Sequence, residues 1–215
     1  MKNSTILLIR HGQSEGNILG IFTGQSGCAL SELGHKQAEM TAEYVCENYQ
    51  IDKVYSSDLP RAIQTAEPIA RLAKRAIITD ARLREIDVGE WEGRRFTDVP
   101  ELFPEDYAIW CNDLIHARCT GGESVLEVTR RAIDALESIA AANPGACVAV
   151  VAHGLVIRAA LWKISGAPEG DMQKQEWGGN CAVSELSFVD GKLQIVSANN
   201  AEHLIGFETI LPKNL

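Results

Sequence analysis

Long apolar runs are missing from this chain of 215 residues. A transmembrane helix needs about 20 consecutive apolar residues, and the run before Arg10, Ile6–Ile9, is too short for the core of a signal peptide. Basic charge is also scarce, since 20 lysines and arginines face 29 acidic residues and leave a net charge of -9. A general nucleic-acid binder would need a basic face. We therefore expect a cytoplasmic protein that binds neither membranes nor nucleic acids.

Paired cysteines are missing as well. The six cysteines contain no C-x-x-C pair and no spacing typical of a zinc site. Several lie in apolar surroundings, so we expect reduced thiols and no structural metal. A chain of this length buries a full α/β core without disulfides. Because no repeat or low-complexity linker divides it, the sequence predicts a single domain over residues 1–215, with no cofactor.

Two short apolar runs each lead into a histidine. Ile6–Ile9 precedes Arg10–Gly12, and Cys147–Ala152 runs directly into His153 and Gly154. Both runs are rich in aliphatic residues and predict buried parallel strands. In open α/β sheets the ligand crevice lies outside the carboxyl ends of the strands. One histidine at a strand end is more often structural than catalytic, but two of them, with Arg10 beside one, indicate a site.

A third candidate lies at the start of a predicted helix. Lys53–Tyr55 reads as a strand, and the segment Ser56–Arg61 combines capping residues with a proline suited to a first helical turn. Arg61 would then lie at a helix N-terminus, where backbone N–H groups already favour an anion. The alternative is a solvent-exposed Arg61 that pairs with Asp58.

Helices alternate with strands along the rest of the chain. The helix that follows Ser124 opens with an S-x-x-E capping box, Ser124 and Glu127. Residues 86–122 differ, because their periodicity is poor and five aromatic residues crowd into them. The remaining predicted elements are helices over Ser31–Tyr49, Pro60–Lys74 and Leu155–Ile164 and a hairpin of Val183–Val189 with Leu193–Ser197 around Asp190-Gly191.

Four segments resemble the histidine phosphatase superfamily, the phosphoglycerate mutase-like proteins. They are residues 8–17, 57–66, 83–93 and 151–154, and they occur in the order of that family. The resemblance implies a three-layer α/β/α sandwich, with a mostly parallel sheet and helices on both faces. It also implies that residues from about 86 to 122 form a variable insertion over the pocket. Aromatic residues there more often anchor an insertion than touch a ligand.

The resemblance also implies roles. His11 would be the nucleophile that forms a phosphohistidine, and Glu85 would be the general acid. The alternative for Glu85 is a surface carboxylate paired with Arg82 or Arg84. No metal is implied, because arginine forks and imidazole donors stabilise a phosphoryl group by themselves. The remaining implied positions are Arg10, Arg61 and His153 around the phosphoryl oxygens, and Asn17, Thr23, Gly24 and Gly154 along the phosphate and substrate pocket.

Two other classes compete with this interpretation. Gly12–Gly16 is a G-x-S-x-G string, the nucleophile-elbow pattern of serine hydrolases, with His153 or His203 as the base. That elbow follows several strands in its own family, whereas here it would follow the first. The second competitor is a relative that binds phosphorylated ligands without catalysis, which would require a distorted pocket around an intact set of catalytic residues.

Within the resembling family, a hydrolase must be distinguished from a mutase. A phosphoglycerate mutase needs extra cations for a second phosphate and a carboxylate, and Val88 and Phe96 stand where such mutases carry a tyrosine and a lysine. Arg94 and Arg95 would either substitute for them or face solvent. The sequence thus predicts a phosphomonoesterase acting on small phosphorylated metabolites, resembling α-ribazole and broad-specificity phosphatases, with a mutase as the alternative. The sequence does not decide the oligomeric state, and an exposed Trp177 and the hairpin edge are the two candidate surfaces for a homodimer.

Overall fold

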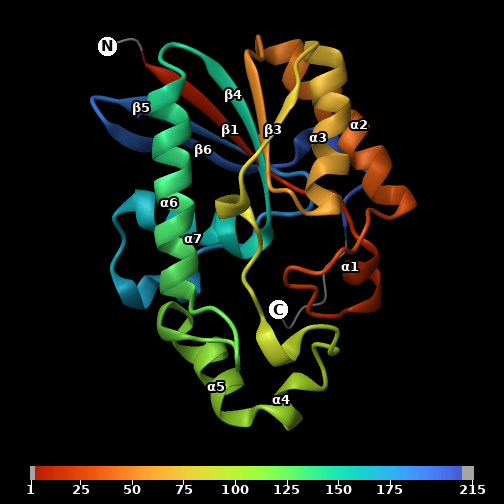
Figure 1. The fold of residues 1–215 in the computed structure, drawn as a ribbon, viewed down its shortest axis with the longest axis vertical. Coiled ribbons are helices and arrows are strands. Elements are labelled where there is room, and N and C mark those ends of the chain that lie inside the picture. Colours follow the sequence, from red (N-terminus) through yellow and green to blue (C-terminus); the bar gives the residue numbers. More distant parts are fainter. Residues whose placement is uncertain (1–2, 210–215) are drawn as a thin grey trace.

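A mixed sheet of six strands forms the centre of the protein (Figure 1). The structure is a computed structural model, and it describes residues 3–209. The strands lie in the order β3-β2-β4-β1-β5-β6; the first four are parallel, β5 is antiparallel to β1, and β6 is antiparallel to β5. The mostly parallel sheet is therefore confirmed. The strand bounds are β1 Ser4–Arg10, β2 Lys53–Ser56, β3 Ile77–Thr79, β4 Cys147–Ala152, β5 Val183–Val189 and β6 Lys192–Asn200.

Helices cover both faces of the sheet, as Figure 1 shows. On β1, Ile6 and Leu8 pack into one apolar cluster, whereas Leu7 and Ile9 pack into a second cluster on the opposite face. Side chains alternate along a strand, so a run that is apolar throughout needs a cover on each side. This confirms the three-layer sandwich. One cover consists of α2 Glu32–Asn48 and α3 Pro60–Ala73, and the other of α6 Val125–Ala142 and α7 Gly154–Ser165.

Capping residues fix the helix starts as the sequence predicts. The Ser31 side chain accepts a hydrogen bond from the N–H of Gly34 at the start of α2. Ser124 and Glu127 form both halves of the capping box of α6. Pro60 occupies the first turn of α3, where its missing N–H costs no hydrogen bond. The long predicted helices begin and end within about one residue of the observed ones.

The hairpin is also confirmed. Asp190 and Gly191 have φ angles of 50° and 77°, as a two-residue turn of type I′ requires. The short elements that the sequence does not predict include β3, with three residues, and α1 Glu15–Leu19, with five. Neither is long enough to show a hydrophobic period.

Residues 86–122 fold as short turns and helices beyond the carboxyl ends of the parallel strands (Figure 1). Trp91 is fully buried and lies between the rings of Phe22, Phe103 and Trp110. The prediction that aromatic residues anchor this segment is confirmed for Trp91. Its elements are 3₁₀ helices at Gly89–Trp91 and Leu114–His116, and α4 Val99–Leu102 and α5 Pro104–Asn112 between them.

The six cysteines are free thiols in the structure. Within residues 3–209, no helix is long and apolar enough to cross a membrane. Further 3₁₀ helices lie at Ala81–Leu83, Glu169–Lys174 and Glu202–Leu204.

Candidate active site

The register of two neighbouring strands brings the two histidines together. In the parallel pair of β1 and β4, Arg10 lies opposite Ala152. The next residues are therefore His11 and His153, whose ring centroids are 5.2 Å apart with the planes tilted by 57°. Both side chains are buried. The meeting of the two strand ends that the sequence predicts is confirmed.

A close backbone approach explains the glycine after His11. A Cβ atom at Gly12 would lie 2.6 Å from the carbonyl oxygen of Gly34, so a larger residue would push α2 away. The Gly12 carbonyl accepts a hydrogen bond from Nδ1 of His11 at 2.7 Å. Because a carbonyl oxygen only accepts, Nδ1 must carry the proton. The lone pair of the neutral ring is then on Nε2.

Burial and two neighbouring cations favour the neutral form of His11. Burial, followed by the charges of Arg61 and Arg10, lowers the pKa of His11 well below its ordinary value. The pKa of His153 is lowered in the same direction, again chiefly by burial and by Arg61. Both ring nitrogens of His153 are buried without a hydrogen-bond partner among the described residues. His11 is thus uncharged at neutral pH, with a lone pair on Nε2, and neither ring nitrogen of His153 is used by a hydrogen bond among the described residues.

The two arginines beside the histidines are buried, and neither pairs with a carboxylate within residues 3–209. Arg10 donates from Nη1 to the carbonyl of Gly178 at 2.6 Å, and its Nε is unpartnered among residues 3–209. Arg61 is completely buried, donates to the carbonyls of Gly24 and Ser26 at 2.8 and 3.2 Å, and also has an unpartnered Nε. Burial lowers the pKa of both guanidinium groups. Buried cations are costly unless they meet an anion, so this arrangement suits an anionic ligand.

The surface pairing proposed for Arg61 is wrong. Asp58 instead holds Arg84, with distances of 2.6 Å to Nε and 2.5 Å to Nη2. Arg82 pairs with Asp80. These two pairs also remove the alternative for Glu85, because neither Arg82 nor Arg84 pairs with it.

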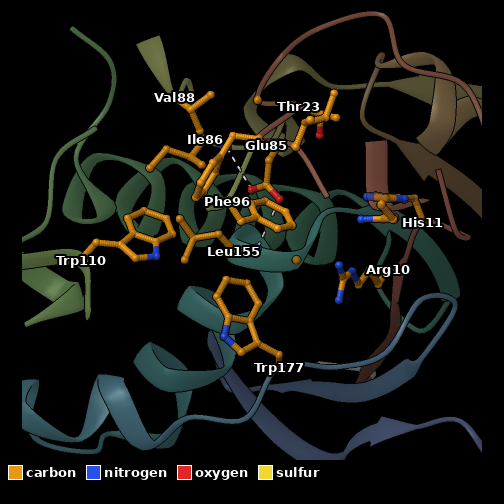
Figure 2. Close-up of a pocket in the computed structure, with 15 residues that line it drawn as sticks. Arg10, His11, Thr23, Glu85, Ile86, Val88, Phe96, Trp110, Leu155 and Trp177 are labelled. Atoms are coloured by element: carbon orange, nitrogen blue, oxygen red, sulfur yellow. Dashed lines mark hydrogen bonds between the residues drawn. The ribbon is translucent and has the colours of Figure 1, made fainter. Parts of the chain in front are cut away.

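Glu85 is half-buried, and its carboxylate faces the same space as His11. One oxygen accepts from the N–H of Ile86 at 3.0 Å, and the other from the N–H of Leu155 at 3.3 Å, in the first turn of α7. Figure 2 shows Glu85 between Arg10 and His11 on one side and Trp110 on the other. These two hydrogen bonds therefore fix the carboxylate between Arg10 and His11 at one end of the pocket and the aromatic residues at the other.

A cavity of about 280 Å³ joins these residues (Figure 2). Seven predicted site residues line it: Arg10, His11, Asn17, Thr23, Gly24, Glu85 and Gly154. Arg61 and His153 lie behind its wall, each with no exposed surface. Trp177, suggested above as an exposed dimer contact, is instead half-buried and lines the cavity.

Arg94 and Arg95, the candidate mutase cations, are exposed and do not line the cavity. The structure thus does not place them where they could replace the missing cations of a mutase pocket.

Two polar residues that sequence reasoning missed hold the site in place. The side-chain amide of Asn180 donates to the carbonyl of His11 at 2.9 Å and to Oδ1 of Asn17 at 3.3 Å. Arg131, in α6, donates to the carbonyl of Glu85 at 3.0 Å and pairs with Glu123 at 2.9 Å. The local signal for Asn180 is its place after Gly178-Gly179, a dipeptide that favours a turn. Arg131 had no signal beyond a helical position.

The serine-hydrolase alternative does not fit the structure. Ser14 is fully buried and caps α1, where its hydroxyl accepts from the N–H of Asn17 and donates to Oδ1 of the same residue. His203 bonds to Thr41 at 2.9 Å and stacks on Tyr44. A capping hydroxyl without a base is no nucleophile.

Known proteins with similar sequences fall in one family. The model of the histidine phosphatase superfamily (branch 1) matches residues 6–201. Phosphoserine phosphatase 1 of Hydrogenobacter thermophilus is 33% identical over 86% of this chain and 85% of its own. A probable phosphoglycerate mutase of Proteus mirabilis is 34% identical over 85% of this chain and 84% of its own.

Solved structures give the same result. Mycobacterial glucosyl-3-phosphoglycerate phosphatase superposes with a TM-score of 0.83 and 28% identity, covering 93% of this chain and all of the other. The relatives thus bear the names of phosphatases and of a mutase.

Proposed function

Because the chain belongs to the histidine phosphatase superfamily (branch 1), we propose that it is a metal-independent phosphomonoesterase for small phosphorylated metabolites. His11 is the nucleophile and Glu85 the general acid. Arg10, Arg61 and His153 stabilise the phosphoryl oxygens, whereas Asn17, Thr23, Gly24 and Gly154 shape the pocket around them. Phosphatase names among its relatives support this function.

One observation carries the proposal. Two buried arginines and a buried histidine have unpartnered nitrogens around His11, and no carboxylate pairs with either arginine within residues 3–209. A phosphoryl group supplies the missing negative charge and the missing acceptors together. Positioning and charge stabilisation are the main demands of phosphoryl transfer.

The reaction then has two steps. Nε2 of His11 attacks phosphorus as the bond to the ester oxygen breaks, and the Glu85 carboxyl gives its proton to the departing alkoxide. In the second step the Glu85 carboxylate takes a proton from water, whose oxygen attacks the phosphohistidine. The N–P bond breaks, inorganic phosphate leaves, and Glu85 is protonated again.

The alternative is a phosphoglycerate mutase, and the name of the Proteus relative favours it. A mutase must hold a second phosphate and a carboxylate away from the reacting group. Among the described residues, however, Arg10 and the neutral His11 are the basic groups on the cavity wall, and both belong to the reacting end. Hydrolysis is therefore the function that the geometry supports better.

A screen of phosphorylated metabolites decides between the two. The substrates include 3-phosphoglycerate, tested with and without added bisphosphoglycerate. Both free phosphate and isomerised product are measured. A hydrolase releases phosphate in proportion to the substrate consumed. Isomerisation with little release would show a mutase instead.

We also infer a cytoplasmic location, which the free state of the six cysteines supports. The homodimer remains a prediction, with the hairpin edge as its remaining candidate surface.

A further inference from the structure

The outer part of the cavity points to the substrate class. We propose that the alcohol esterified to the phosphate is apolar, with an aliphatic or aromatic group within a few bonds of the ester oxygen and no charge in that part. This inference rests on the proposed phosphomonoesterase activity. The substrate class differs from the compounds in the names of the relatives, which are phosphoserine and phosphoglycerates. In those compounds a carboxylate lies close to the phosphate.

Apolar side chains dominate the cavity beyond Glu85. Phe96, Trp110 and Trp177 surround the space there, with Ile86 and Val88 above it in Figure 2. The wall as a whole contains eight apolar residues: Ile21, Phe22, Ile86, Val88, Phe96, Trp110, Leu155 and Trp177. A wall of this kind gains free energy when it removes apolar surface from water.

Charge complementarity argues against a carboxylate in the same space. Glu85 is the acidic residue on the wall, and within residues 3–209 no lysine lines it. Arg10 is the arginine on the wall, and it lies at the phosphate end. A charged group taken from water into this zone would lose its hydration without finding an opposite charge. Phosphate esters whose alcohol part carries a carboxylate near the ester oxygen are therefore disfavoured.

The apolar wall is fixed by contacts of its own. Phe96 meets Phe22 edge to face, with ring centroids 4.8 Å apart. The guanidinium of Arg158 lies 4.5 Å from the centre of the Trp177 ring, and carbonyls of Gln175 and Gln173 hold that guanidinium at 2.7 and 2.8 Å. A wall that is fixed before binding loses little conformational entropy when a ligand arrives.

Trp177 also lies directly beside the phosphate end. A Cβ atom placed on Gly154 would meet the Trp177 ring and the Arg10 guanidinium, each at 3.3 Å. The indole and the guanidinium thus border the same small space. The first carbons of the alcohol must therefore contact aromatic surface as soon as they leave the phosphate.

A second, more polar cavity lies farther out. Its volume is about 490 Å³, and it shares Phe22, Phe96, Trp110 and Trp177 with the first. Its other lining residues include Arg158, Lys174 and Glu176. The four shared aromatic residues therefore form an apolar zone between the phosphate end and the outer polar surface, and a charged group is accommodated only beyond that zone.

Three esters with the same kind of leaving oxygen test the inference. Propyl, 3-phenylpropyl and 3-carboxypropyl phosphate all expel a primary alkoxide, so binding in the outer cavity separates their kcat/KM values. We expect 3-phenylpropyl phosphate to exceed propyl phosphate by roughly tenfold or more, from burial of the ring. The carboxypropyl ester should fall below the propyl ester. A carboxypropyl ester that equals or exceeds the phenylpropyl ester would overturn the proposal.

Variants of the wall sharpen the test. Trp110→Ala should lower the ratio of phenylpropyl to propyl kcat/KM by about threefold or more, whereas Phe96→Lys should raise the ratio of carboxypropyl to propyl. Ile109→Ala is the matched control, since Ile109 is the exposed neighbour of Trp110 in α5 and lines neither cavity. A ratio measured in one preparation cancels the fraction of folded enzyme. Unchanged ratios in both wall variants would contradict the inference.

Different results would overturn the substrate class and the phosphomonoesterase activity. Hydrolysis of all three esters with a preference for the carboxypropyl ester overturns the substrate class and leaves the phosphomonoesterase in place. Hydrolysis of none of them, together with no phosphate on His11 from p-nitrophenyl phosphate, overturns the proposed function and the substrate class with it.

Discussion

The two ends of the cavity are built by different means. At the phosphate end, Arg10 is the last residue of β1, and His11 and His153 directly follow β1 and β4, whose register places the two histidines side by side. The outer end takes its wall from separate segments outside the sheet, with Phe96 and Trp110 in the insertion, Trp110 on the short helix α5, and Trp177 just after a 3₁₀ helix. The sheet therefore fixes the reacting groups, whereas loops and a short helix outside the sheet fix what surrounds the alcohol.

This difference separates reaction from selectivity. A change at the phosphate end should affect every ester, because every ester presents the same phosphoryl group. A change at the outer wall should alter the ratio between esters. Substitutions at the phosphate end test this contrast.

The largest effect is expected at the nucleophile. His11→Ala removes the covalent path and should lower kcat/KM by about 10³-fold or more for alkyl and aryl esters alike. Steady-state hydrolysis of propyl and p-nitrophenyl phosphate measures it. Chelators should leave the wild-type rate unchanged. Full activity in the variant would reject His11 as the nucleophile.

Glu85→Gln should show an effect that depends on the leaving group. The amide keeps the size of the carboxyl but has no proton to give, so formation of the phosphohistidine from an alkyl ester should slow by ~10²–10⁴-fold. The nitrophenolate of p-nitrophenyl phosphate departs unaided and should be spared. A burst experiment isolates this first step, because the same carboxylate activates water in the second. Equal slowing of both esters would make Glu85 a structural residue and direct attention to Glu15 or Glu90.

The arginine fork is tested by substitutions that keep the charge. Arg10→Lys and Arg61→Lys lose the planar geometry that matches phosphate and should each lower kcat/KM by roughly 10- to 100-fold. Arg94→Ala is the control, since Arg94 is exposed and away from the cavity, and it should change the rate little. Similar losses at all three positions would contradict the assignment. A loss at Arg94 restricted to phosphoglycerates would favour the mutase.

The smallest effect concerns stability. Folding depresses the pKa of His11 and His153 below the ordinary value of 6.5, so below that pH the unfolded chain binds more protons than the folded one. The free energy of unfolding should fall by up to about 1.4 kcal/mol per pH unit for each histidine as the pH decreases from about 6.5 toward the folded pKa. This stability is fully present above pH 6.5.

Urea unfolding of the wild type and of His11→Asn, at about pH 7 and about pH 5.5, measures the difference. The variant should lose less stability on acidification than the wild type. The same loss in both proteins would show that His11 is not held neutral by its surroundings.

The sequence predicts the phosphate end of the cavity better than the outer end. His11 and His153 were placed correctly because two apolar runs end at them, and Arg61 because Pro60 precedes it. The sequence did not reveal that Trp177 lines the cavity, since its partner Arg158 lies 19 residues earlier in a different element. Arg131 holds the carbonyl of Glu85 across a separation of 46 residues. Such contacts depend on the packed fold and leave no local period to read.

The short elements were missed for a related reason. β3 pairs only with β2 at the edge of the sheet, and its three residues show no alternation. α4 and α5 each start with a proline in the first turn, but their mixed surfaces give no apolar stripe. These elements owe their structure to tertiary contacts, among them those around Trp91.

Detection of the covalent intermediate tests the central claim most directly. Wild-type enzyme mixed with p-nitrophenyl phosphate and quenched in base within one turnover should carry one phosphate on His11, stable in alkali and lost in acid. Peptide mass spectrometry locates it, and His11→Ala under the same conditions should carry none. Phosphate found on Ser14, or hydrolysis at the full rate with no phosphorylated residue, would contradict the account.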